Sequence, residues 1–151
     1  MTDKPEFQLG IAMAGAISAG AYSAGVMDFL IEALDAYEAA KVAPDWTGPT
    51  HDVRIPVMTG ASAGGMTAAI AALHAFHGIT PVRPGIAPPP KAANRLYSSW
   101  VTDISLEALL ETSDLKGGQN QKGVTSALCC DVLSQIVDGA FNLQGTPRER
   151  N

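Results

Sequence analysis

The stretch GASAGG, residues 60 to 65, places one hydroxyl, that of Ser62, in a run of glycine and alanine. The apolar run VRIPVMT precedes it and predicts a buried strand from Val53 to Thr59. Small and apolar residues from Ala63 to His77 predict a buried helix after it. A strand, a sharp turn and a helix give G-x-S-x-G the setting of a nucleophile elbow.

Two interpretations of this turn are open from the pattern alone. In an elbow, the positions two residues from the nucleophile must lack bulk, which accounts for Gly60 and Gly64. Ser62 would then be held at a helix N-terminus, whose free N–H groups favour negative charge. In the alternative, the turn is only compact, and the Ser62 hydroxyl caps the helix.

The N-terminal third predicts a second strand and helix. FQLGIAMAG predicts a short buried strand that stops at Gly15, and a helix should follow from about Ala19 to Lys41. The residues expected on its buried face are Val26, Phe29, Leu30, Ala33, Leu34 and Tyr37. Those expected on its solvated face are Asp28, Glu32, Asp35 and Glu38.

Strand, helix, strand, helix is a βαβα order, so we expect an α/β fold with a parallel sheet flanked by helices. Pro56 is unusual inside a strand and argues against regular pairing there. After a proline-rich loop, residues 96–111 look helical in pieces. Residues 114–123 predict a flexible polar loop, and residues 125–141 a last helix.

The 151 residues suit one domain, 46% hydrophobic and 17% charged, so we expect a globular chain. A net charge of -5 argues against nucleic acid as the main partner. Cys129 and Cys130 are adjacent and have no other cysteine to pair with, which favours the cytoplasm. No metal-ligand cluster appears in the sequence, so we expect no metal.

Residues Leu9 to Met27 carry no charge and are long enough to span a bilayer. This run is mostly alanine, glycine and serine, however, with few large apolar side chains to favour insertion. The preceding MTDKPEFQ is not a basic signal region. We therefore expect neither a signal peptide nor a membrane anchor.

A serine nucleophile needs a base, and the histidines are badly placed for that role. His74 and His77 lie on the helix that Ser62 opens, roughly 18 to 22 Å along it. His51 precedes the strand and lies roughly 30 Å away at the far end of the sheet. A Ser-His-Asp triad is therefore not expected, while a carboxylate paired directly with serine remains open.

The turn after the first strand, GAISAGAYSAGV, offers backbone donors. Gly15 and Gly20 permit close backbone approach, and N–H groups there could stabilise an oxyanion facing Ser62. A dinucleotide-binding turn would need glycine where Ile17 stands, so that function and its cofactor are not expected.

The segment GAISAGAYSAGVMDFL, followed some forty residues later by MTGASAGG, resembles the patatin-like phospholipases, and the match is clearest over residues 8 to 78. The resemblance implies a serine acyl hydrolase that uses a Ser-Asp dyad without histidine or cofactor. It also implies an acyl lipid as substrate and leaves peripheral contact with a membrane open.

Carried over by position, Ser62 is the nucleophile, and Gly60 and Gly64 form the elbow. The backbone positions implied for the oxyanion hole are Gly15, Ala16, Ile17 and Ala63. This sequence departs from the family where Ala16 and Ile17 replace glycines and where Ala19 replaces a basic residue. The lost basic side chain puts an anion contact from that position in doubt.

The family's dyad aspartate lies in a D-G-G or D-G-A motif, and DGA occurs at Asp138 to Ala140. Helical spacing instead makes Asp138 a solvated residue on the polar face of the last helix, with Gly139 as its C-terminal stop. We therefore expect a catalytic domain truncated at the C-terminus, with its aspartate beyond Asn151 or on another chain, and keep Asp138 as the second candidate. A non-catalytic module that retains the elbow to bind acyl groups or a partner is the alternative function. The inward stripe expected on this helix is Leu128, Cys129, Val132, Leu133, Ile136 and Val137.

Overall fold

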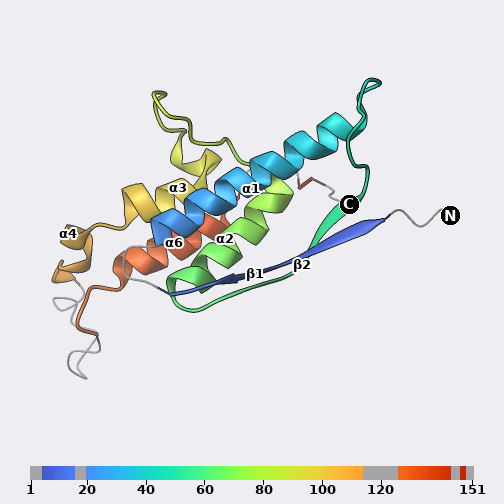
Figure 1. Cartoon of the computed structure of the whole chain (residues 1–151). Helices are drawn as coiled ribbons and strands as arrows, with labels where there is room; N and C mark the ends of the chain where they lie inside the picture. The colour runs from blue at the N-terminus through green and yellow to red at the C-terminus, as the bar shows by residue number, and fades with distance from the viewer. Residues whose placement is uncertain (1–4, 16–19, 114–125, 144–146, 149–151) are drawn as a thin grey trace.

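A computed structural model of the chain describes residues 5–15, 20–113, 126–143 and 147–148. Two strands and two long helices come first and alternate, as predicted, so the chain is α/β (Figure 1). They are β1 (Glu6–Met13), α1 (Gly20–Lys41), β2 (Asp52–Gly60) and α2 (Ala63–His77). The later elements are η1 (Lys91–Ala93), α3 (Arg95–Tyr97), η2 (Ser98–Asp103), α4 (Leu106–Leu109) and α6 (Asp131–Phe141). The predicted polar loop at residues 114–123 lies outside the described residues.

β1 and β2 form a two-stranded parallel sheet with one irregularity. Gln8 pairs with Arg54, but Gly10 pairs with Val57, so β2 contains one residue more than β1 between these pairs. The extra residue falls at Ile55–Pro56. A bulge is one of the few places where a strand accepts proline, which has no N–H to donate. The predicted strand is therefore present, and its irregular pairing coincides with Pro56.

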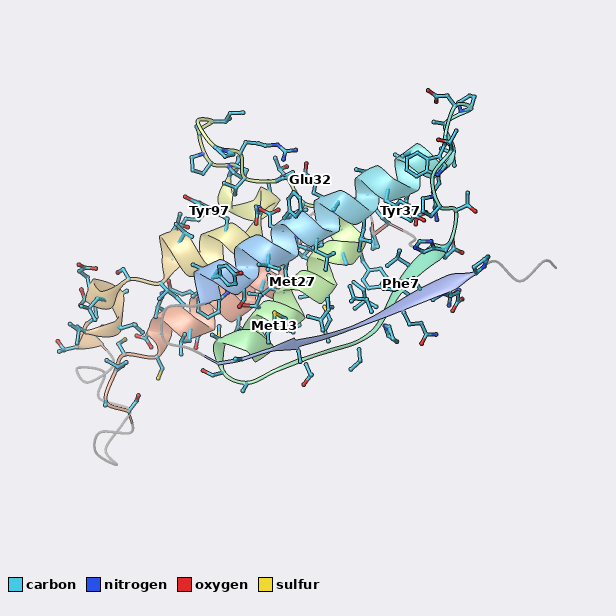
Figure 2. All side chains as sticks on the ribbon, viewed as in Figure 1. Phe7, Met13, Met27, Glu32, Tyr37 and Tyr97 are labelled. Atoms are coloured by element: carbon cyan, nitrogen blue, oxygen red, sulfur yellow. The ribbon has the colours of Figure 1, made fainter. Side chains whose placement is uncertain are left out.

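α1 and α2 lie on the same face of the sheet and pack against each other (Figure 1). Met13 of β1 packs against the core cluster to which the buried Met27 of α1 belongs; both residues are labelled in Figure 2. The opposite face is open at Val57, which is 54% exposed. The buried core consists of Ala24, Met27, Ile31, Ile70, Ala71, Leu96 and Ala140.

The predicted buried face of α1 is wrong at several positions. Val26 and Phe29 are exposed, Ala33 is exposed, and Asp28, expected in solvent, is buried. The stripe that the helix buries is Gly20, Ala24, Met27, Asp28 and Ile31. Glycine is needed at Gly20 because a Cβ there would lie 2.3 Å from Cε3 of Trp100. The close approach at this position is therefore to an aromatic ring and not to a backbone.

The last helix starts later than predicted, ends at the predicted Phe141, and does not stop at Gly139. α6 begins at Asp131 and continues through Gly139 to Phe141, so Gly139 is not its stop. A Cβ at Gly139 would lie 3.1 Å from Nη1 of Arg95, so this glycine makes room for a guanidinium. The inward stripe is Cys129, Val132, Ile136 and Ala140, whereas Leu128 and Val137 are exposed.

The uncharged run from Leu9 to Met27 does not form one continuous element. Its start belongs to β1 and its end to the first turns of α1. Within the described ranges, no helix is both long enough and apolar enough to cross a bilayer.

Candidate functional site at the turn between β2 and α2

Ser62 joins β2 to α2 in a strained conformation. Its φ is 49° and its ψ is -119°, and it is the sole non-glycine residue with positive φ among those described. Such a backbone conformation costs an L-residue about 1–3 kcal/mol and persists where the surrounding structure imposes it. The residue is also exposed. The turn therefore holds a serine in solvent at the expense of backbone strain.

Two glycines make this turn possible because backbone segments meet at both. A Cβ on Gly60 would lie 2.3 Å from the carbonyl carbon of Gly64. A Cβ on Gly64 would lie 2.3 Å from the carbonyl oxygen of Met13, at the end of β1. Because neither neighbour is a movable side chain, no larger residue fits without shifting the backbone.

Backbone hydrogen bonds fix the turn on both sides. Ala61 N–H donates to Met13 O at 3.2 Å, and Gly64 N–H donates to Ala61 O at 2.9 Å. Met66 N–H donates to Ser62 O at 3.1 Å, which starts the helical ladder. The Ser62 side chain makes no capping hydrogen bond. The capping interpretation of this hydroxyl therefore does not hold, and the hydroxyl is left at the surface.

The end of the first strand reaches the elbow. A Cβ on Gly15 would lie 2.9 Å from Ala61 O and 3.1 Å from Cβ of Ser62. Ala63, the buried first residue of α2, belongs to a helical turn whose N–H groups lack partners within the helix. Two predicted backbone donors, Gly15 and Ala63, are thus on either side of Ser62. The other two, Ala16 and Ile17, lie outside the described residues.

His74 is buried, and both of its ring nitrogens are occupied. Nε2 lies 3.0 Å from the N–H of Arg95, which donates to it, so Nδ1 carries the proton and donates to Gly78 O at 3.2 Å. Burial lowers the pKa of this imidazole below its ordinary value, and the nearby charges of Arg95 and His77 act in the same direction. His74 therefore closes the far end of α2 as a neutral structural group.

The other two histidines also belong to distant ends of their elements. His51 lies before β2, between the rings of Phe7 and Tyr37 at centroid distances of 6.0 and 5.5 Å. His77 is the last residue of α2, of which Ser62 precedes the first. Among the described residues, no histidine or carboxylate forms a hydrogen bond with Ser62. Asp138 is exposed on α6.

Sequence reasoning missed a buried polar cluster around Asp28. Its Oδ2 accepts from Asn94 Nδ2 at 3.0 Å and from Val82 N–H at 3.2 Å, while Oδ1 has no partner. Asn94 also donates to Thr80 O at 3.1 Å. This cluster ties the proline-rich segment to α1. The signal was the helical spacing that Asp28 shares with Ala24 and Ile31, both buried.

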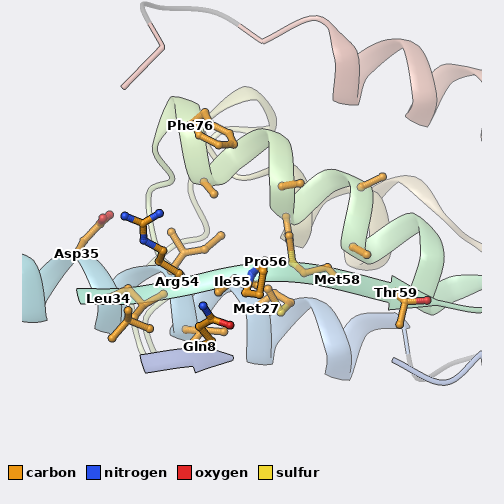
Figure 3. A pocket seen from close by; sticks show the side chains of 18 of the residues that line it. Gln8, Met27, Leu34, Asp35, Arg54, Ile55, Pro56, Met58, Thr59 and Phe76 are labelled. Atoms are coloured by element: carbon orange, nitrogen blue, oxygen red, sulfur yellow. The ribbon is translucent and has the colours of Figure 1, made fainter. Parts of the chain in front are cut away.

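A trough of about 1130 Å³ extends from the elbow along β2, below α2 and beside α1 (Figure 3). Thr59, Gly60 and Gly65 line it near Ser62. Asp35 and Arg54 line its other end. Most of its other lining residues are apolar and include Leu30, Leu34, Ile55, Met58 and Ala72. Within the described ranges, no three metal-binding side chains come together.

The chain is 48% identical over 161 residues to an uncharacterized protein, y4iI, of Sinorhizobium fredii. The match covers 97% of this chain and 22% of that protein, so the chain spans about a fifth of the relative's length. No family model matches the chain, and no solved structure matches it.

Proposed function

We propose that this chain carries the nucleophile of a patatin-like serine acyl hydrolase. The observation that carries the proposal is the backbone of Ser62, strained at φ 49° and ψ -119°, with its exposed side chain making no capping bond. A turn that served only to reverse the chain could place glycine there and avoid the strain. A serine at this strained position is best explained by chemistry of its hydroxyl.

In the proposed reaction, Ser62 Oγ attacks the carbonyl carbon of an acyl ester and loses its proton to a carboxylate base. The negative oxygen that forms accepts hydrogen bonds from the N–H of Ala63 and from the segment that begins at Gly15. Collapse of this intermediate expels the alcohol, which takes a proton from the base, and leaves an acyl-serine. Water then attacks the acyl-serine and releases the carboxylic acid.

The base in this scheme is an aspartate outside the described residues. Asp138 is the second candidate, but it is exposed on α6 and forms no hydrogen bond with Ser62. The substrate class is an acyl lipid, as the resemblance over residues 8 to 78 implies. A cytoplasmic protein that contacts a membrane peripherally would have access to such a substrate.

The test is labelling by a fluorophosphonate probe, together with ester hydrolysis, on the protein expressed from its natural reading frame. Ser62→Ala should abolish both, because the stretch GASAGG contains no other hydroxyl. The matched control is Ser134→Ala, which removes an exposed hydroxyl on α6 and should leave both signals unchanged. Hydrolysis that survives Ser62→Ala would exclude this nucleophile, and a complete lack of labelling would favour a non-catalytic module.

Two further variants locate the base. His51→Gln combined with His77→Gln should leave hydrolysis intact, since neither side chain is near the elbow. His74 is kept because the fold uses it. Asp138→Asn should also leave the rate unchanged, whereas loss of a general base typically costs about 10²- to 10⁴-fold. A drop of that size would make Asp138 the base.

A further inference from the structure

The free edge of β2 carries backbone groups that face the trough. In the described part of the chain the sheet has only the order β1-β2, so the outer edge of β2 has no neighbouring strand. Nearly every residue from Val53 to Gly60 lines the trough, whichever face its side chain occupies. The trough therefore runs along the edge of the strand, where N–H and C=O groups point outward.

The roof and back of the trough are apolar. The residues of α2 that line it are small, and α2 lies over the edge of β2 (Figure 3). α1 closes the back with Met27, Leu30, Ile31 and Leu34. The small α2 residues are Gly65, Ala68, Ala69, Ala72 and Ala75. The result is a long slot with aliphatic walls and one polar margin of peptide groups.

We propose that this trough seats a third β-strand, parallel to β2, which belongs to the same natural polypeptide. Crossovers between parallel strands are right-handed, and α1 and α2 cover the same face. A strand that follows α2 in the sheet must therefore lie beside β2, on the side away from β1. This position is the free edge of β2, under α2. The inference concerns assembly of the sheet and does not depend on the hydrolase proposal.

A strand fits the slot better than a hydrocarbon chain does. A fatty acyl chain could fill the apolar walls, but it has no groups to pair with the peptide N–H and C=O of the β2 edge. Buried peptide groups without partners are costly, and a strand supplies a partner for most of them. Pro56 has no N–H, so we expect the new ladder to be strongest from Val57 to Gly60.

The position of Arg148 indicates the source of the strand. Arg148 lines the trough at the end where β2 begins, donates from Nη2 to Asp35 Oδ2 at 3.1 Å, and donates its backbone N–H to Phe76 O. β2 runs from that end toward Ser62. Polypeptide that continues from Arg148 in the natural protein would therefore enter the slot in the direction that a parallel strand requires. More than three quarters of the matched relative lies outside the region of similarity, so such a segment is available there.

The experiment measures access to Ala69 in the protein expressed from its natural reading frame. Ala69 is exposed here and lines the trough, so a third strand should bury it. Ala69→Cys, in a Cys130→Ser background that removes the exposed natural thiol, is labelled with a maleimide. Val42→Cys is the matched control, because Val42 is 84% exposed and lies away from the trough. We expect the cysteine at position 69 to react at least about tenfold more slowly than the control.

Equal labelling at the two positions would overturn the proposal. Protection that disappears after solvent delipidation would identify a bound lipid instead, and protection that disappears on dilution would identify a second copy of the chain. If Ala69→Cys does not fold, hydrogen exchange on the unmodified protein replaces it. Ala61 N–H donates to Met13 O of β1, and N–H groups alternate between the two sides of a strand, so Met58 N–H points to the free edge of β2. The amide of Met58 should then be protected, and rapid exchange there would also reject the third strand.

Discussion

The two ends of α2 are built on opposite principles. At the N-terminal end, Ser62 is strained and exposed, and its side chain leaves the capping position unused. At the C-terminal end, His74 is buried, and each ring nitrogen has a backbone partner. Backbone segments meet closely at Gly60 and Gly64 at the first end, but only the second end gains hydrogen bonds from its polar side chain. The comparison shows one helix stabilised at its far end while its near end presents a hydroxyl.

The largest expected effect tests the backbone contact at the near end. Gly64→Val should reduce the free energy of unfolding by about 4 kcal/mol or more, because the new Cβ would meet Met13 O. Gly25→Ala is the control: a Cβ there meets nothing within 4 Å, and alanine favours the helix by about 1 kcal/mol. Chemical denaturation measures both. A folded Gly64→Val protein of normal stability would mean that no sharp elbow exists.

The next effect tests the far end. His74→Phe keeps a ring in place but leaves the N–H of Arg95 and the carbonyl of Gly78 without their partner. We expect a loss of about 1–3 kcal/mol in the free energy of unfolding. His77→Phe is the matched control, because Nδ1 of His77 has no hydrogen-bond partner. Equal losses in the two variants would show that His74 contributes only packing.

A smaller effect should appear as a pH dependence. The pKa of His74 is lowered in the folded chain, chiefly by burial, so the unfolded chain binds the proton more readily. The stability contributed by neutral His74 is therefore present above the unfolded pKa of about 6.5 and declines as the pH falls below it. The decline should not exceed about 1.4 kcal/mol per pH unit. Urea titrations at several pH values should show it, and His74→Phe should flatten the curve between pH 7 and 5.

The smallest effect tests the strain itself. Ser62→Gly should raise the free energy of unfolding by about 1 kcal/mol relative to Ser62→Ala, because only glycine adopts positive φ without steric cost. Both variants should be inactive if the proposed function holds. Thermal denaturation of the two proteins side by side gives the difference. Equal stability would indicate that the strain at Ser62 is relieved in solution.

Local pattern was sufficient for the order of the elements. The apolar run before Ser62 and the small residues after it predicted β2 to within one residue at each end, and the bounds of α2 matched. Pro56 also signalled irregular pairing, since a missing donor is a local property.

Local pattern could not predict contacts between residues that are far apart in the sequence. The buried side of α1 depends on Asn94 and Val82, which hold Asp28 inside, and nothing near Val26 or Phe29 in sequence shows that they stay exposed. Gly20 likewise needs its size because of Trp100, eighty positions later. At the elbow, the pattern could place Ser62 but could not show that its hydroxyl leaves the helix uncapped.

Because β2 contains a bulge, the position of the elbow does not depend on the number of residues before the bulge. From Gly10–Val57 to Met13–Gly60 the two strands stay in register, and these pairs alone align Ser62 with Gly15. The surplus residue is absorbed upstream, at Ile55–Pro56. Removal of Pro56 would restore regular pairing there without shifting a pair near Ser62. We therefore expect a change of one residue in β2 upstream of Val57 to leave the hydroxyl of Ser62 in place.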